Sequence, residues 1–334
     1  MAKIVCRFAA GLALTAACLS APAQESAAPK KPLMLITWFG PGGIPLPIGS
    51  DWKPELLTVY DNIQRPVAQF NNPVSHVNVS YILFENHSGK PTSEGCQEDA
   101  ITPILQRQAS LISKRKDDHF AGQSGQTFAI TSFLVDQSVA QIPHQRNLFG
   151  FLGDAKTCAE VHISSYGDDP GVLLAMQTTL AEFHPDLDYN PSAQDYFLFA
   201  SILFKGAPGL SAPYYKEFLN RLPLDSQTLT MRRVATDQLV MALGMSGDLK
   251  NSRAVAEMAI KDDPDYPINY YNLACADAES VNSASAQEHL QQAFDHRANV
   301  IKGESMPDPL KDDSILKLKK NTAFWAFVQS LPTN

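Results

Sequence analysis

Three side chains that could support nucleophilic chemistry stand at alternate positions of one short segment: Cys158, Glu160 and His162. In an extended strand, alternate residues point to the same face, so the three would lie side by side. A cysteine beside a histidine is the arrangement that activates a thiolate nucleophile. A disulfide at Cys158 would remove that chemistry, and a polar strand face accounts for the same pattern. The segment therefore supports no catalytic assignment.

The other reactive residue types lack the spacing that a metal, a nucleotide or a cofactor requires. The eight histidines include no His-Glu-x-x-His pattern, and no Cys-x-x-Cys pair or Gly-x-Ser-x-Gly elbow occurs. The glycine-rich run 40–43 leads into the proline-rich segment 44–47, so we expect a loop there. A phosphate cradle would need a helix N-terminus behind it. The sequence predicts no metal, no cofactor and no catalytic residue, and leans away from an enzyme without deciding the question.

The cysteines favour one disulfide. Of the five, Cys96, Cys158 and Cys275 lie outside the first 23 residues. An oxidising compartment would allow a bond, and Cys96 and Cys158 both lie in the N-terminal half, near the ends of expected elements. We predict the bond Cys96–Cys158, with two free thiols as the alternative. Cys275 lies among alanines in an expected helix and is interpreted as a small buried thiol.

The first 23 residues have the organisation of a secretory signal peptide. Lys3 and Arg7 supply a positive start, residues 8–19 are apolar, and small residues at 21–23 form a cleavage site. We expect cleavage after Ala23 and a location in the periplasm or outside the cell.

Two alternatives to cleavage stay open. Residues 14–18 resemble a bacterial lipoprotein box whose leucine lies one position too early, which would place a lipid anchor on Cys18. The apolar run 8–19 could instead be a short membrane anchor. No later run is long and apolar enough for a transmembrane helix.

Cleavage would leave an acidic chain. It removes Lys3, Arg7 and no acidic residue, so the formal net charge changes from −8 to −10. A chain this acidic, without a basic stripe, is a poor binder of nucleic acid or of an anionic membrane. The cluster Lys114-Arg115-Lys116 is followed by two aspartates and is predicted to be a solvated helix end.

The N-terminal half alternates strand and helix signals. Residues 24–32 are predicted to be a disordered lead-in and residues 33–184 an α+β domain. One helix is expected from Asp99, with its apolar side extending to Leu111 and Ile112, and another begins at Pro170 with Asp169 as its cap. Apolar alternation and β-forming residues predict strands at 33–38, 76–84, 128–135, 147–152 and 158–164.

The C-terminal half is predicted to be helical. A polar, proline-bounded linker at 184–191 precedes a helical domain at 192–334. An amphipathic stretch near the end is expected to cap the stack of helices. The expected helices cover 194–204, 213–222, 226–245, 250–261, 269–279 and 284–298.

Within this half, residues 233–298 contain two stretches that match when one is shifted by 34 positions. Large residues recur inside the first helix of each pair, and small residues recur where two helices would touch. The matching pairs are Leu239 with Leu273, Ser252 with Ala286, and Ala259 with Ala293. This period and pattern resemble the tetratricopeptide repeat, a helix-turn-helix unit that stacks on its neighbours. The resemblance covers about a fifth of the chain and extends, more weakly, back to residue 193.

The resemblance implies a groove that binds a protein or peptide segment. Some members of the family clamp a partner's terminal carboxylate with cationic residues and asparagine. Only Asn272 matches such a position, since the corresponding residues Val234, Gln238, Met241, Ile268 and Cys275 supply no cation. We therefore expect no carboxylate clamp and take Tyr271 and Asn272 as candidate partner-binding residues, because aromatic residues make good anchors.

Three residues depart from the family pattern. Thr236 stands where an aromatic residue is preferred, Asp277 where a large apolar residue is preferred, and Val281 at the usual turn glycine. The sequence as a whole predicts an exported, non-enzymatic interaction or scaffold protein of the cell envelope. The alternative is an enzyme, or a binder of small ligands or glycans, with its site in the α+β domain or the cleft between domains.

Overall fold

The computed structural model describes residues 32–47, 51–60, 65–122, 125–135, 144–167 and 169–332. The expected signal peptide, the lipoprotein box at Cys18 and the lead-in up to residue 31 lie outside these ranges. Contacts divide the described chain into two compact units, one ending at residue 202 and one beginning at residue 203. Helix α3, Ala193–Gly206, carries the chain from the first to the second. The domain bounds 33–184 and 192–334 stay predictions.

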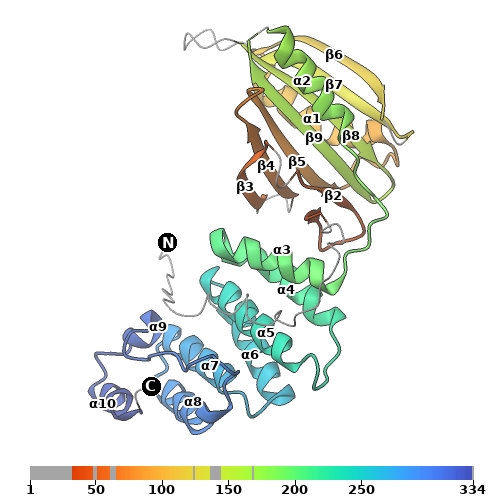
Figure 1. Cartoon of the computed structure of the whole chain (residues 1–334). Helices are drawn as coiled ribbons and strands as arrows, with labels where there is room; N and C mark the ends of the chain where they lie inside the picture. Colours follow the sequence, from red (N-terminus) through yellow and green to blue (C-terminus); the bar gives the residue numbers. More distant parts are fainter. Residues whose placement is uncertain are drawn as a thin grey trace. The chain divides into compact units, whose positions relative to one another are not determined.

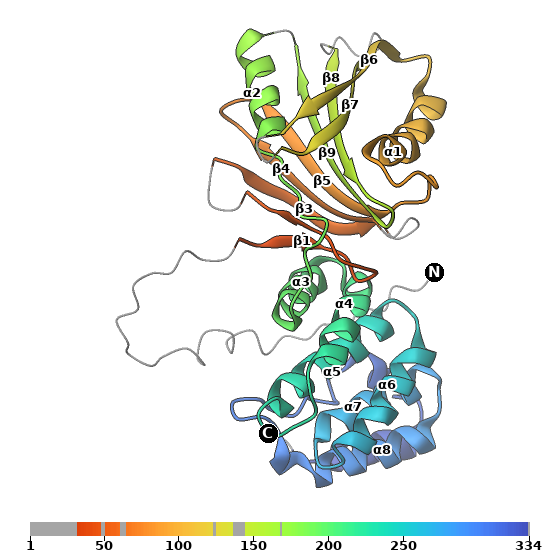
Figure 2. The same ribbon diagram turned by 90° about the vertical axis from the view of Figure 1, so that its right-hand side faces the viewer.

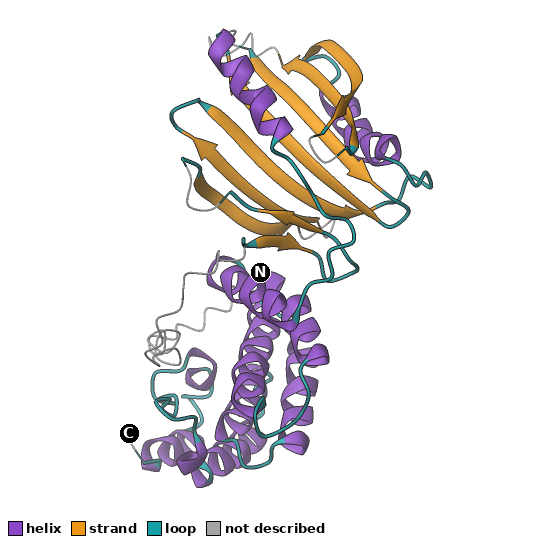
Figure 3. Ribbon diagram, turned by 45° about the vertical axis from the view of Figure 1, so that its right-hand side comes forward, coloured by secondary structure: helices purple, strands orange, loops and turns teal. Residues whose placement is uncertain are grey.

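A seven-stranded antiparallel sheet dominates the first unit, in the order β3-β4-β5-β9-β8-β7-β6 (Figures 1 and 3). A separate hairpin of β1, Met34–Ile36, and β2, Gly43–Pro45, contacts β5. The strands of the large sheet are β3 (Lys53–Tyr60), β4 (Arg65–Asn72), β5 (Val77–Glu85), β6 (Ile112–Ala121), β7 (Thr127–Val135), β8 (Gln145–Gly153) and β9 (Thr157–Tyr166).

Two helices cover opposite faces of this sheet (Figure 2). Helix α1, Ser93–Gln108, packs on β7, β8 and β9, whereas α2, Pro170–Ala181, packs on β9 and β5. Phe149 and Phe151 lie in the core beneath α1. Gly150, between them, faces the other way, and a Cβ there would lie 2.6 Å from Leu180 of α2. The alternation of apolar and polar residues in β9 is typical of a half-buried strand, but this interpretation is wrong, because each face of β9 is covered by a helix.

The structure corrects the predicted helix near Asp99. Helix α1 begins at Ser93, because the Thr92 hydroxyl accepts a hydrogen bond from the Gly95 backbone N–H at 3.2 Å and caps the first turn. The helix ends at Gln108, so Leu111 and Ile112, predicted to extend its apolar side, do not belong to it.

The basic cluster at 114–116 was also misplaced by the prediction. It lies in β6, an edge strand with almost every residue exposed, and not at a helix end. Charged side chains on an edge strand protect its unpaired backbone groups from pairing with another chain. The local sequence does not reveal the strand, because its charges suppress any apolar alternation.

Strands β2, β3 and β4 were not predicted either. The segment 44–47, expected to be only a loop, contains part of β2, in which Ile44 pairs with Leu35 of β1. Strands β3 and β4 contain Pro54 and Pro66 near their starts. Proline argues against a central strand, and both strands form because their neighbours in the sheet fix them.

The second unit is helical throughout its described elements (Figure 1). The order of strands and helices along the chain confirms the prediction of an α+β region followed by an all-α region. Helix α4 begins five residues before its predicted start, with Pro208 in its first turn, a position that suits proline. The helices are α4 (Pro208–Arg221), α5 (Leu229–Met245), α6 (Leu249–Asp262), α7 (Pro267–Glu279), α8 (Ser283–Asp295), α9 (Asp313–Leu316) and α10 (Thr322–Ser330).

The 34-residue period of the sequence recurs in the backbone. Asp248 caps α6, and Asn282, 34 residues later, caps α8; each side chain accepts a hydrogen bond from the N–H three residues on. The preceding turn residues, Gly247 and Val281, both have left-handed backbones, with φ of 85° and 58°. The pairs α5–α6 and α7–α8 therefore share one local plan.

The C-terminal segment packs back on the last helix pair. Ile315, Phe324 and Val328 are buried in the same cluster as Leu290 of α8. The Glu279 carboxylate, at the end of α7, accepts a hydrogen bond from the Ser314 hydroxyl at 2.7 Å. These contacts complete the core around α7 and α8.

Candidate functional site

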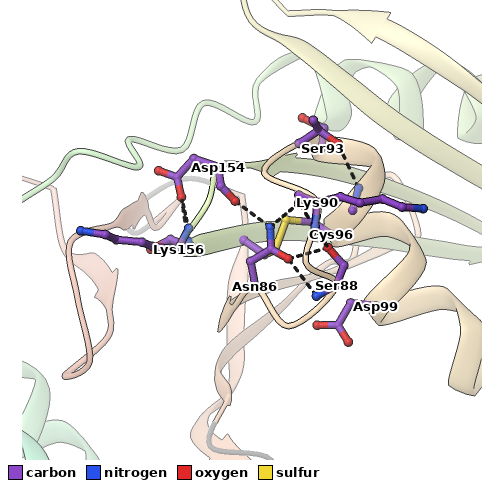
Figure 4. The surroundings of a disulfide bond; sticks show 12 residues. Asn86, Ser88, Lys90, Ser93, Cys96, Asp99, Asp154 and Lys156 are labelled. Carbon is purple, nitrogen blue, oxygen red and sulfur yellow. Dashed lines mark hydrogen bonds between the residues drawn. A yellow bond between two sulfur atoms is a disulfide. The ribbon is translucent and has the colours of Figure 1, made fainter.

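A disulfide occupies the residue that the strand-face pattern suggested as a nucleophile. Cys96 of α1 and Cys158 of β9 are bonded, with their Cα atoms 5.6 Å apart. Because both sulfurs are in the bond, Cys158 supplies no thiolate. Beside it, the Asn86 amide donates to the backbone carbonyls of Lys90 and Asp154 at 2.8 and 2.6 Å (Figure 4). The surroundings of the bond are thus those of a structural link.

His162 is held as a neutral ring. Its imidazole stacks on Phe149, with the ring centroids 4.1 Å apart, and its Nε2 lies 2.9 Å from Oδ1 of Asn147. Burial lowers the pKa of His162 to about 4. Because His162 stays neutral near pH 7 and Cys158 is in a disulfide, the two residues cannot form a cysteine–histidine pair.

Glu160, on the same face, has a buried carboxyl group with few interactions that would stabilise its negative charge. It is 4% exposed and lies between Ile82 and Phe151 of the neighbouring strands. Among the described residues none donates a hydrogen bond to it, and Arg65 is the one opposite charge that acts on it. Burial raises the pKa of Glu160 to about 7, against the opposing effect of Arg65. Its apolar flanks therefore favour the protonated form.

The described residues were also considered for metal-ligand groups and for helices that could span a membrane. Across the ranges that the structure covers, no three His, Cys, Asp or Glu side chains are grouped to hold a metal ion. No helix within those ranges combines the length and apolar character needed to cross a bilayer.

A pocket opens in the helical unit between α5 and α7, the first helices of consecutive pairs. Its empty volume is about 470 Å³, open solvent included. Met241 and Met245, one turn apart on α5, give it a flexible apolar wall, a type of surface that adapts to different side chains. The lining comprises Val240, Met241, Gly244, Met245, Leu249, Ser252, Asn272, Cys275, Ala276, Glu279 and Ser314.

A partly buried carboxylate stands next to this lining. Asp237 lies one turn before Met241 on α5, and its Oδ1 accepts a hydrogen bond from the Asn272 amide at 2.8 Å. Burial raises the pKa of Asp237 to about 6; the Asn272 hydrogen bond opposes this, and the negative charge of Glu304 adds to it. Sequence reasoning missed Asp237; its four-residue spacing to Met241 and Met245 places the three on one helix face but does not by itself single out the carboxylate.

The cation nearest to Asp237 along α5 is already engaged. Arg233, one turn earlier, donates from Nε and Nη2 to the two carboxylate oxygens of Asp263 at 2.6 and 3.0 Å. Glu304 is held by the Tyr266 hydroxyl, which lies 2.9 and 3.0 Å from its oxygens. Asp237 therefore carries its negative charge without an ion-pair partner among the described residues.

The two candidate partner-binding residues lie in different surroundings. Asn272 lines the pocket, is 7% exposed and holds Asp237 with its amide. Tyr271 is fully buried, in one core cluster with Ile315 and Leu318. Partner contact by either residue stays a prediction.

Asp277, which stands where the tetratricopeptide pattern prefers a large apolar residue, has a structural explanation. The residue is 0% exposed, and its Oδ2 lies 2.6 Å from Nδ1 of His289 on α8. Its Oδ1 pairs with the Arg253 guanidinium of α6. A buried carboxylate is accommodated at this position because two basic side chains receive it.

Comparison with known proteins finds similarity among solved structures. No protein-family model matches the chain, and no curated protein matches it. Among solved structures, the chain is similar to the TPR domain of Sgt2 from Aspergillus fumigatus, at 15% sequence identity and a TM-score of 0.31. The match covers 43% of this chain and 88% of that one. A likeness this low carries no argument about this protein.

Proposed function

We propose that this chain is an exported, non-enzymatic interaction protein of the cell envelope, whose tetratricopeptide-like helix pairs hold a segment of a partner protein. The observation that carries the proposal is the methionine-lined pocket between α5 and α7. Stacked helix pairs offer a preformed surface, so little ordering is required when a segment binds.

The repeat assignment rests on features that recur at 34 residues. Ser252 and Ala286, at equivalent positions of α6 and α8, are both buried. The capping side chains Asp248 and Asn282 recur at the same interval. These matches favour two repeats over an ordinary helical hairpin, which would not repeat both its caps and its contact residues.

Binding is favoured over catalysis because polar groups at the pocket already satisfy one another. The Ser252 hydroxyl donates to the Val240 carbonyl at 2.9 Å, and Glu279 is held by Ser314 and Lys317. A catalytic site needs groups poised toward a substrate. In the sheet unit, the disulfide at Cys158 argues against the nucleophile considered first.

Export is supported by two independent features. The first 23 residues carry the pattern of a secretory signal, with a lipid anchor at Cys18 as the alternative. The bond Cys96–Cys158 suits an oxidising compartment, where such bonds persist.

The test is site-specific photo-crosslinking in the source cells. A photoreactive amino acid replaces Met241 in the pocket or, as the matched control, Met258 of α6, which is 62% exposed. We expect a protein adduct from position 241 that is absent from position 258. Equal adducts from both positions, or none from position 241, would contradict the proposal.

A further inference from the structure

We infer that the partner segment presents a cationic side chain beside an apolar one, with the cation on Asp237 and the apolar group in the pocket. This inference rests on the proposed function and names the chemistry of the partner. It follows from the order of side chains along α5, where Asp237, Met241 and Met245 recur every four residues and share one helix face.

The position of Asn272 links the carboxylate to the pocket. This residue lines the pocket and also donates to Asp237 at 2.8 Å. The pocket continues from Asn272 along α7 to Ala276 and Glu279, opposite Met241 and Met245. An apolar side chain seated between the methionines therefore has the Asp237 carboxylate within the reach of a neighbouring long side chain.

The charges around Asp237 favour a cation. Facing it are Asn272 of α7, Tyr266 before α7 and Glu304 after α8, none of them cationic. Arg233 of α5 is committed to Asp263. A desolvated carboxylate next to a second acid has a raised free energy, and an incoming ammonium or guanidinium would lower it.

The same arrangement disfavours an anionic partner. A terminal carboxylate placed near Asn272 would meet Asp237 and Glu304, and no free cation among the described residues would receive it. Like charges brought together at an interface weaken binding. The chemistry is thus the reverse of the carboxylate clamp that some tetratricopeptide proteins use.

The affinity of this site for a cation should depend on pH, because Asp237 can take up a proton. With its pKa near 6, Asp237 is charged at pH 7.5 and mostly protonated at pH 5. A cation that needs the charged form must therefore bind more weakly as the pH falls through 6. Lysine and arginine side chains on the ligand do not titrate in that range.

The experiment uses phage-displayed random dodecapeptides selected at pH 7.5 against the full chain. The binding of enriched peptides is then compared, by fluorescence anisotropy, across wild type and four variants. Asp237→Asn removes the charge, Gly244→Trp fills the pocket, and Glu288→Gln removes an exposed charge on α8 as the matched control. Asp237→Glu tests whether a carboxylate restores binding.

We expect enriched peptides to combine Lys or Arg with Leu, Met or Phe. Their affinity should fall about tenfold in Asp237→Asn, at least as much in Gly244→Trp, and not at all in Glu288→Gln. Wild-type affinity should fall about tenfold between pH 7.5 and pH 5, a readout that needs no variant.

The failures of the two proposals are distinguishable. Peptides that Gly244→Trp weakens, but that lack a basic residue or bind Asp237→Asn and wild type at pH 5 unchanged, overturn this inference and leave the pocket as the binding site. If Gly244→Trp weakens no enriched peptide, both the pocket and the cation assignment fall.

Discussion

Two buried carboxylates, one in each unit, are compensated in different ways. Asp277 of α7 is 0% exposed and pairs with Arg253 and His289. Glu160 of β9 is 4% exposed and receives no hydrogen bond from a described residue. The helical unit stabilises its buried charge with partners from two neighbouring helices, whereas the sheet unit favours the uncharged form of its acid. Burial alone therefore does not decide the charge state; the partners do.

The α5–α6 helix pair provides a comparison for Asp277, because the equivalent position there is apolar. Leu243 occupies the equivalent position 34 residues earlier and is 5% exposed. The residues equivalent to Arg253 and His289 there are Leu219 and Val255. One helix pair thus has a buried ion pair where the other has an apolar contact. Substituting Leu243 by Asp and Asp277 by Leu separates the effect of basic neighbours on stability from the effect of burial.

The largest effect is expected from Leu243→Asp. It buries a carboxylate where no basic residue is equivalent to Arg253 or His289, so we expect a loss of about 4 kcal/mol in the free energy of unfolding. Urea denaturation followed by far-UV circular dichroism measures it. A loss below about 1 kcal/mol would mean that this position does not need a partner.

Asp277→Ala should cost about 3 kcal/mol, because it removes the carboxylate shared by Arg253 and His289 and also leaves a buried cavity. Asp277→Leu fills that space with the apolar residue of the other pair, so it should stay within about 1 kcal/mol of wild type, since both basic side chains retain some exposure to water. Equal losses in the two variants, measured by the same urea titration, would contradict this account of the ion pairs.

Glu160 should make the stability of the sheet unit depend on pH. Its pKa in the folded state, about 7, lies above the ordinary value of 4.5, so the folded state binds its proton more tightly. The resulting stabilisation is present below pH 4.5 and is lost as the pH rises through 7, by about 3 kcal/mol. Glu160→Gln should remove this loss and be more stable than wild type at pH 8.

Thermal unfolding at a series of pH values measures the difference between Glu160→Gln and wild type. Glu182→Gln serves as the matched control, because Glu182 lies at the end of α2 in the same unit. A difference between Glu160→Gln and wild type that stays constant from pH 4.5 to pH 8 would rule out the raised pKa.

The smallest effect concerns the two turns. Val281 has a left-handed backbone, φ 58°, at the position equivalent to Gly247. A β-branched residue is strained there, so Val281→Gly should stabilise the chain by about 1 kcal/mol, and Gly247→Val should destabilise it by about the same amount. Melting temperatures that shift in the same direction for both variants would contradict the equivalence of the turns.

The sequence predicted the helical unit better than the sheet, for a physical reason. The signals of helix pairs are local: caps such as Asp248 and Asn282 and the 34-residue recurrence lie within the segment that they shape. Strands β3, β4 and β6 are shaped by neighbours distant in the chain, and their prolines and charges point locally to other structures. The polar face of β9 looked solvent-exposed for the same reason, since α1 covers it from elsewhere in the sequence.

The candidate site was predicted in part. Of the two predicted partner-binding residues, Asn272 lines the pocket and Tyr271 is buried in the core, and partner contact by either stays a prediction. Met241 was considered only as a position without a cation, although its role in the pocket is apolar. Asp237 was missed, because its significance comes from Asn272 and Glu304, which tertiary structure brings close to it.

The most direct test of the central claim, that a partner binds the α5–α7 pocket, uses the protein captured by crosslinking at position 241. Its affinity is measured for wild type, Gly244→Trp and Glu160→Gln by isothermal titration calorimetry. The account predicts a loss of at least tenfold for Gly244→Trp and no change for Glu160→Gln. Unchanged binding by Gly244→Trp, together with a loss in Glu160→Gln, would contradict it and move the function to the sheet unit.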